Sequence, residues 1–192
     1  GYSNPIDQFV VSKLVKLGIT PSKQCTDTEF LRRLSIDLTG TLPSPEEVLS
    51  FVGNNSPNKR TLKINELLKR PSYAAWWANK LCDFTGCNPT SISSLVGVAR
   101  EDGYIKATRW YDWIYERIAN NESYVDLVEG IMLADISSGV GKGMPYFWTR
   151  QSLEEPKDTA MSVAHSFLGL QLQCTDCHQH LFDQWTQNDF VD

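Results

Sequence analysis

The residues best suited to chemistry lie near the C-terminus, in the pattern Cys174-x-x-Cys177-His178. Two thiols at this spacing can form thioethers with the two vinyl groups of haem, and the adjacent histidine can bind the iron. The pattern predicts that Cys174 and Cys177 anchor a haem c covalently. It also predicts that His178 is the proximal iron ligand.

Two other interpretations of this segment remain open. Together with His180, the two cysteines and His178 supply four nitrogen and sulfur ligands, enough for tetrahedral zinc, although so tight a cluster is strained around one ion. Alternatively, the cysteines are bridged in a structural domain of a secreted polysaccharide-processing protein. Nearby aromatic residues favour haem, because they offer an apolar surface for a porphyrin, although core packing is their ordinary role. These residues are Phe182 and Trp185.

A second axial ligand for a haem iron is harder to find in the sequence. Fourteen residues follow His178 and none is methionine. His180 is too close to His178 for both to bind opposite faces of one iron, so it is expected to orient the site or bind a second metal. The first distal candidate is His165, on the helix before the motif, with Met144 and Met161 as weaker candidates. Each also has an ordinary packing role open to it.

Composition and charge exclude some classes of protein. Of 192 residues, 41% are hydrophobic and 21% are charged, which is typical of a folded globular chain. The net charge of −5 and dispersed basic residues argue against a nucleic-acid partner. No apolar run is long enough to predict a transmembrane segment, and no signal peptide is recognisable. The chain begins with glycine rather than methionine, so we expect it to be part of a longer polypeptide.

Helical periodicity and capping signals predict an all-α fold, an irregular multi-helix domain spanning residues 1–192. Capping boxes are predicted at Thr26 and Ser44, and glycine stops at Gly18 and Gly40. The expected helices cover residues 5–17, 27–39, 45–52, 57–70, 73–84, 105–118, 124–133 and 156–172. Two long loops are expected at 85–103 and 134–154. The tryptophans follow helical spacing, which favours burial over a carbohydrate-binding role.

Three further cysteines lie outside the motif. Cys82 and Cys87 are close enough in sequence to form a small-loop disulfide, leaving Cys25 unpaired, or all three are buried thiols. Haem attachment and disulfide formation both occur outside the cytosol. We therefore expect a periplasmic or extracellular location.

Five blocks of the chain resemble the planctomycete-type cytochrome-associated (PSCyt) domains. They are NPIDxFV from residue 4, RRLxxDLTG from residue 32, LPxPEEV from residue 42, FLGLQL from residue 167 and CxxCHxHxFDxWTQxDF from residue 174. One departure is Leu181, where the family pattern leads us to expect proline.

The resemblance implies a domain of a large secreted bacterial protein. Such proteins often carry a separate haem c domain upstream and a domain of unknown function downstream. Its partners are then other domains or subunits of an extracytoplasmic redox assembly. No paired carboxylates and no Ser-His-Asp spacing stand out in the sequence. We therefore expect an electron-transfer module rather than a catalyst.

Overall fold

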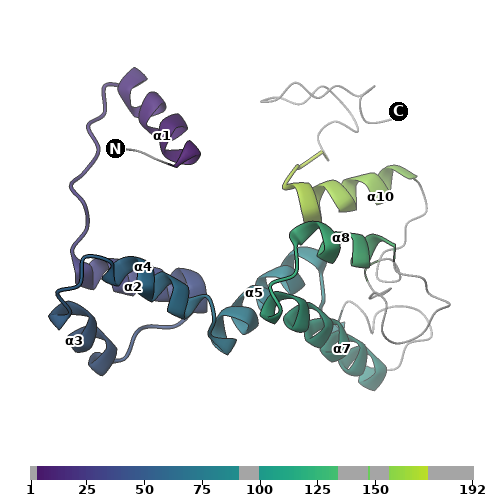
Figure 1. Cartoon of the computed structure of the whole chain (residues 1–192). Helices are drawn as coiled ribbons and strands as arrows, with labels where there is room; N and C mark the ends of the chain where they lie inside the picture. The colour runs from purple at the N-terminus through teal and green to yellow at the C-terminus, as the bar shows by residue number, and fades with distance from the viewer. Residues whose placement is uncertain (1–3, 91–99, 134–146, 148–155, 173–192) are drawn as a thin grey trace.

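The computed structural model describes residues 4–90, 100–133, 147 and 156–172 (Figure 1). Within these ranges the regular structure is helical and contains no strand, which confirms the all-α prediction. The helices are α1 (Pro5–Lys16), α2 (Asp27–Thr39), α3 (Pro45–Gly53), α4 (Lys59–Leu67), α5 (Pro71–Thr85), α7 (Arg100–Ala119), α8 (Tyr124–Met132), α10 (Pro156–Val163) and a π-helix (Ala164–Leu168).

Local capping defines the first group of helices, α2 to α4. Both predicted capping boxes are present: the hydroxyls of Thr26 and Ser44 accept the backbone N–H of the glutamate three residues on, and that glutamate accepts in return. Leu31, Phe51 and Leu67, one from each helix, are buried. Helix α4 begins two residues later than predicted, at Lys59.

A network of charged side chains ties α3 to α4 and to the start of α5. Glu47 accepts hydrogen bonds from Lys63, at 3.1 Å, and from Arg70. Glu66 accepts from the same two cations. The Arg70 guanidinium, helped by Ser44 and Lys63, holds the pKa of Glu47 at about 2, below its ordinary value of 4.5. Glu47 therefore remains ionised, and keeps its ion pairs with Lys63 and Arg70, down to low pH.

Helix α5 links this first group to the second group, formed by α5, α7, α8 and α10 (Figure 1). Near its start, the Trp76 ring packs on Gly40, which ends α2 in the left-handed conformation (φ 68°). Further along, Ala78 and Leu81 enter the second core. One helix thus contributes to both groups.

The second core is built around tryptophans. Trp110 is fully buried and Trp113 nearly so, in contact with Ile114, Leu127 and Ile131. The predicted burial of these two residues is confirmed, whereas Trp76 and Trp77 on α5 are only half-buried. Trp148 lies outside the described residues.

Two further predictions of local structure were wrong in part. Residues 100–103, expected in a loop, form the first turn of α7, because packing of that helix outweighs the low helix propensity of Gly103. The last helical segment ends at Leu168 rather than Leu172, because Gly169 adopts a left-handed conformation (φ 67°). The expected loop 134–154 lies outside the described residues except for Phe147, which is buried with its ring centroid 5.2 Å from that of Phe167.

Helix α1 lies away from both groups (Figure 1). None of its residues is buried, and Phe9 is 79% exposed. Gly18 follows the helix with φ 65°, as its predicted role as a stop requires. Across the described part of the chain, no helix has the length and apolarity needed to cross a membrane.

The contact between Gly40 and Trp76 predicts a severe effect for Gly40→Ala. A Cβ at this position lies 2.4 Å from the Trp76 ring, and the positive φ adds strain. We expect a loss of about 2–4 kcal/mol in the free energy of unfolding, measured by urea denaturation. The control is Gly53→Ala at the end of α3, where no atom lies within 4 Å. Equal stability of the two variants would contradict the packing described.

The depressed pKa of Glu47 predicts how stability depends on pH. Because the folded-state pKa is lowered, its contribution is present above about pH 4.5 and is lost as pH falls toward about 2. Glu47→Gln keeps an acceptor for the capping box but removes the charge. After discounting for solvent screening, we expect it to cost about 1 kcal/mol at pH 7 and nearly nothing at pH 2. Glu29 is also a capping glutamate, but no cation binds it as Arg70 and Lys63 bind Glu47. The control variant Glu29→Gln should therefore change the pH dependence of stability less than Glu47→Gln does.

Candidate functional site

Most of the residues predicted to form the site lie outside the described residues. This holds for Cys174, Cys177, His178 and His180, and also for Phe182, Trp185 and Met144. Their geometry stays a prediction. The structure does describe the helical segment that leads into the motif, and with it the two remaining candidates, Met161 and His165.

His165 belongs to a π-helix that continues α10 without a break. This wider helical turn ends at Gly169, and the N–H of Leu170 donates to the carbonyl oxygen of Ala164 at 3.1 Å. Short π-helices are rare and occur frequently at functional sites, because they change the direction in which side chains project. Here the change falls on the histidine that the sequence singled out.

The inner face of the π-helix is fixed to the rest of the protein. The Tyr124 hydroxyl, from the first residue of α8, donates to the carbonyl oxygen of Phe167 at 3.0 Å. Phe167 and Ser166 are buried, whereas His165 is exposed. Burial raises the pKa of Tyr124, so the hydroxyl remains a donor at neutral pH. The imidazole of His165 is therefore on the open side of a firmly held turn.

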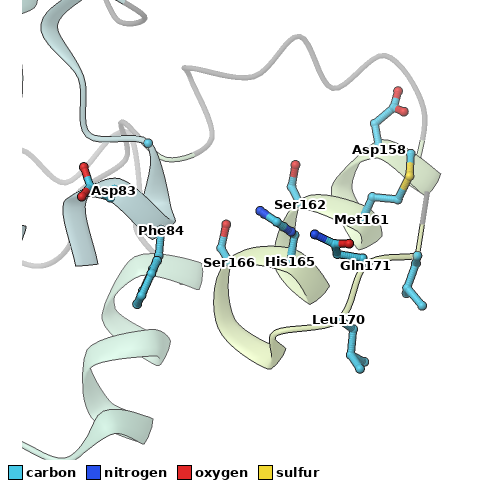
Figure 2. A pocket seen from close by; sticks show the side chains of 11 residues that line it. Asp83, Phe84, Asp158, Met161, Ser162, His165, Ser166, Leu170 and Gln171 are labelled. Carbon is cyan, nitrogen blue, oxygen red and sulfur yellow. The ribbon is translucent and has the colours of Figure 1, made fainter. Parts of the chain in front are cut away.

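That open side borders a cavity of about 410 Å³, a volume in the range of small-molecule sites. Figure 2 shows Asp83 and Phe84, at the end of α5, on one side and the side chains of α10 and the π-helix on the other. Met161 and His165 are one helical turn apart, and both line the cavity. The rest of the lining is Gly86, Asp158, Ser162, Ser166, Leu170, Gln171 and Leu172.

The described lining of the cavity offers candidate axial ligands for a haem iron, but no complete metal site among the described residues. Within residues 4–90, 100–133, 147 and 156–172, no three His, Cys, Asp or Glu side chains gather in an arrangement able to hold a metal ion. One imidazole and one thioether on the same wall are, in contrast, the two side chains that commonly take an axial position on haem iron. The donor set present thus fits a haem whose other ligand comes from elsewhere.

Sequence reasoning missed the opposite wall and the anchor of the site. Asp83, Phe84 and Gly86 lie about eighty residues before His165, and no pattern links the two segments. From the sequence, Tyr124 was expected only as the first residue of the helix 124–133. Its hydrogen bond to Phe167 depends on tertiary packing, which leaves no local signal.

In the described part of the chain, fold and cavity together define a helical protein with a ligand-sized cavity, whose lining includes Leu172, two residues before Cys174 in the sequence. The sequence profile of a family described as "PSCyt2: Protein of unknown function (DUF1549)" matches residues 5–192. The chain belongs to this family, which agrees with the resemblance seen in the sequence. No curated protein and no solved structure gives a significant match.

The hydrogen bond from Tyr124 predicts a local effect for Tyr124→Phe. We expect a loss of about 1 kcal/mol in stability, since the carbonyl of Phe167 loses its donor. Hydrogen exchange should accelerate at the amides of residues 164–170, measured by mass spectrometry. Tyr104→Phe, which changes an exposed tyrosine on α7, is the matched control. Unchanged exchange in the Tyr124 variant would show that this bond does not hold the π-helix.

Proposed function

We propose that this chain is an extracytoplasmic domain that binds haem c covalently and transfers electrons within a larger redox assembly. One observation carries the proposal. A C-x-x-C-H motif follows, within two residues, a cavity lined by a histidine and a methionine. The motif supplies the covalent anchors and one axial ligand, and the cavity wall supplies candidates for the other.

Chain length limits how far the cofactor can lie from this cavity. Leu172 lines the cavity, and Cys174 is two residues further on. Because an extended chain spans at most about 3.6 Å per residue, the Cα atoms of these two residues are at most about 7 Å apart. A haem bound to Cys174 is thus tethered close to His165 and Met161.

The residues then have distinct roles. Cys174 and Cys177 hold the haem, and His178 binds the iron from one side. His165 is the preferred ligand for the other side, because its imidazole is exposed on the cavity wall while Met161 is half-buried. When bound, the haem supplies the one-electron chemistry. The protein sets its orientation, its axial ligands and its access to water.

The proposed location and partners follow from the same chemistry. Thioether attachment of haem occurs outside the cytosol, which supports a periplasmic or extracellular location. An electron carrier also needs a donor and an acceptor, and these are other domains or subunits of the assembly. His180, Phe182 and Trp185 are proposed to orient or cover the haem rather than to bind its iron.

The test is production in a periplasm that contains cytochrome c maturation enzymes. We expect a Soret band, pigment that resists extraction by acid acetone, and an intact mass raised by one haem. Cys174→Ala with Cys177→Ala should remove all three signals, whereas Cys25→Ser, on the distant α2 side, should leave them unchanged. His165→Ala should shift the Soret maximum and the reduction potential, and Met161→Leu should not.

Two results would overturn the proposal. One is a well-folded, haem-free protein obtained under these conditions. The other is stoichiometric zinc bound through Cys174 and Cys177, which would establish the metal-site interpretation instead. If haem is attached and the His165 variant has an unchanged spectrum, attachment stands and the assignment of His165 fails.

A further inference from the structure

Cys82 and Cys87 lie at the end of α5, on either side of Gly86. Gly86 has a left-handed conformation (φ 69°), and the N–H of Cys87 donates to the carbonyl oxygen of Cys82 at 2.8 Å. This hydrogen bond joins the first and last of six residues and is the 6→1 bond of a Schellman motif, in which the two side chains at these positions are frequently in contact. Helix termination therefore brings the two cysteines together.

The backbone geometry places the pair within the range of a disulfide. Ordinary bond lengths on either side of the 2.8 Å hydrogen bond limit the separation of the two Cα atoms to about 7 Å, and bond angles shorten it further. Disulfides span Cα separations of about 4.4–6.8 Å. No movement of α5 is needed to bridge the two residues.

The two side chains also meet. Both are thiols in this structure. Cys82 is 7% exposed, within the second core, and Cys87 packs against the same core. A hydrogen bond with the Cys87 thiol, together with burial, raises the pKa of the Cys82 thiol above its usual range. Cys87 itself donates through Sγ to the carbonyl oxygen of Ala107 at 3.3 Å.

We propose that Cys82 and Cys87 form an intramolecular disulfide that locks the end of α5. Two S–H bonds are lost and one S–S bond forms. The two electrons and two protons pass to a disulfide oxidant, either oxidised glutathione, which becomes two molecules of reduced glutathione, or a disulfide-donating protein, which becomes a dithiol. The proposal does not depend on haem binding.

The environment favours a lasting disulfide over a reactive dithiol. Cysteine pairs that act as strong oxidants stabilise the thiolate of one cysteine, and this thiolate favours the reduced form of the pair. Cys82 is in an apolar core that disfavours its thiolate, so the reduced form has no such support. Oxidation removes the hydrogen bond from the Cys87 thiol to the carbonyl oxygen of Ala107. This loss costs little, because a thiol is a weak donor.

The disulfide has a consequence for the candidate site. Asp83, Phe84 and Gly86 lie between the two cysteines and line the cavity, and Asp83 and Phe84 lie on the side opposite His165 (Figure 2). Closing the ring from 82 to 87 restricts this wall. It also removes two thiols that compete with Cys174 and Cys177 for pairing.

Peptide mapping tests the proposal directly, because trypsin separates the cysteines by sequence. Cys82 and Cys87 share the peptide 81–100, Cys25 lies in 24–32, and Cys174 and Cys177 lie in 158–192. The protein is purified from an oxidising compartment, equilibrated with equal reduced and oxidised glutathione, alkylated and digested. The disulfide form of peptide 81–100 is not alkylated and is lighter by two hydrogen atoms than the same peptide with two thiols. We expect this form to exceed the alkylated form by about tenfold or more. A fully alkylated peptide, or one cross-linked to another peptide, would overturn the proposal.

Thermal unfolding provides a second measurement that does not depend on digestion. Reductant should lower the melting temperature of the wild-type protein by about 5 °C. Cys87→Ala should abolish this dependence on reductant, while Cys25→Ala should preserve it. A Cys87→Ala variant with the full dependence on reductant would show that other cysteines are responsible.

Discussion

The packing of α5 is the constraint on which the rest of the structure depends. Ala74 and Ala78 are buried to within 2% exposure, and their small side chains let neighbouring helices approach closely. Trp76 packs on Gly40 at the end of α2, and Leu81 enters the core beside Trp110. The last turn of the same helix then forms one wall of the cavity. Displacement of α5 would disturb both groups of helices and the candidate site together.

The other wall of the cavity, formed by α10 and the π-helix, is held in place by different contacts. The π-helix is held on its inner face by Phe167, both through the packing of its ring on Phe147 and through its carbonyl, which accepts from Tyr124. Gly169 then turns the chain away in a conformation that other residues rarely adopt. Because these constraints act on the neighbours of His165 rather than on its imidazole, the imidazole remains available to a ligand.

Features encoded by neighbouring residues could be predicted from the sequence, and features formed by distant residues could not. The capping boxes at Thr26 and Ser44 involve partners three residues apart, so their patterns were sufficient. The start of α7 was missed because its stability comes from packing rather than from the propensities of residues such as Gly103. His165 and Met161 were named from the sequence, but their shared cavity depends on Phe84, far away along the chain. The π-helix has no sequence pattern that we could have used.

The proposed haem and the proposed disulfide place opposite demands on one chain. Haem attachment needs Cys174 and Cys177 as thiols, whereas the compartment that permits it also oxidises thiols. Cys82 and Cys87 are brought together by the end of a helix, so their pairing needs only local folding, which is fast compared with contacts between distant segments. Early local pairing removes two thiols that could attack a disulfide of the motif, and burial of Cys82 limits the access of other thiols to the bond. In the oxidising compartment proposed for this protein, the fold of α5 thus offers a physical reason why its five cysteines need not form mismatched disulfides.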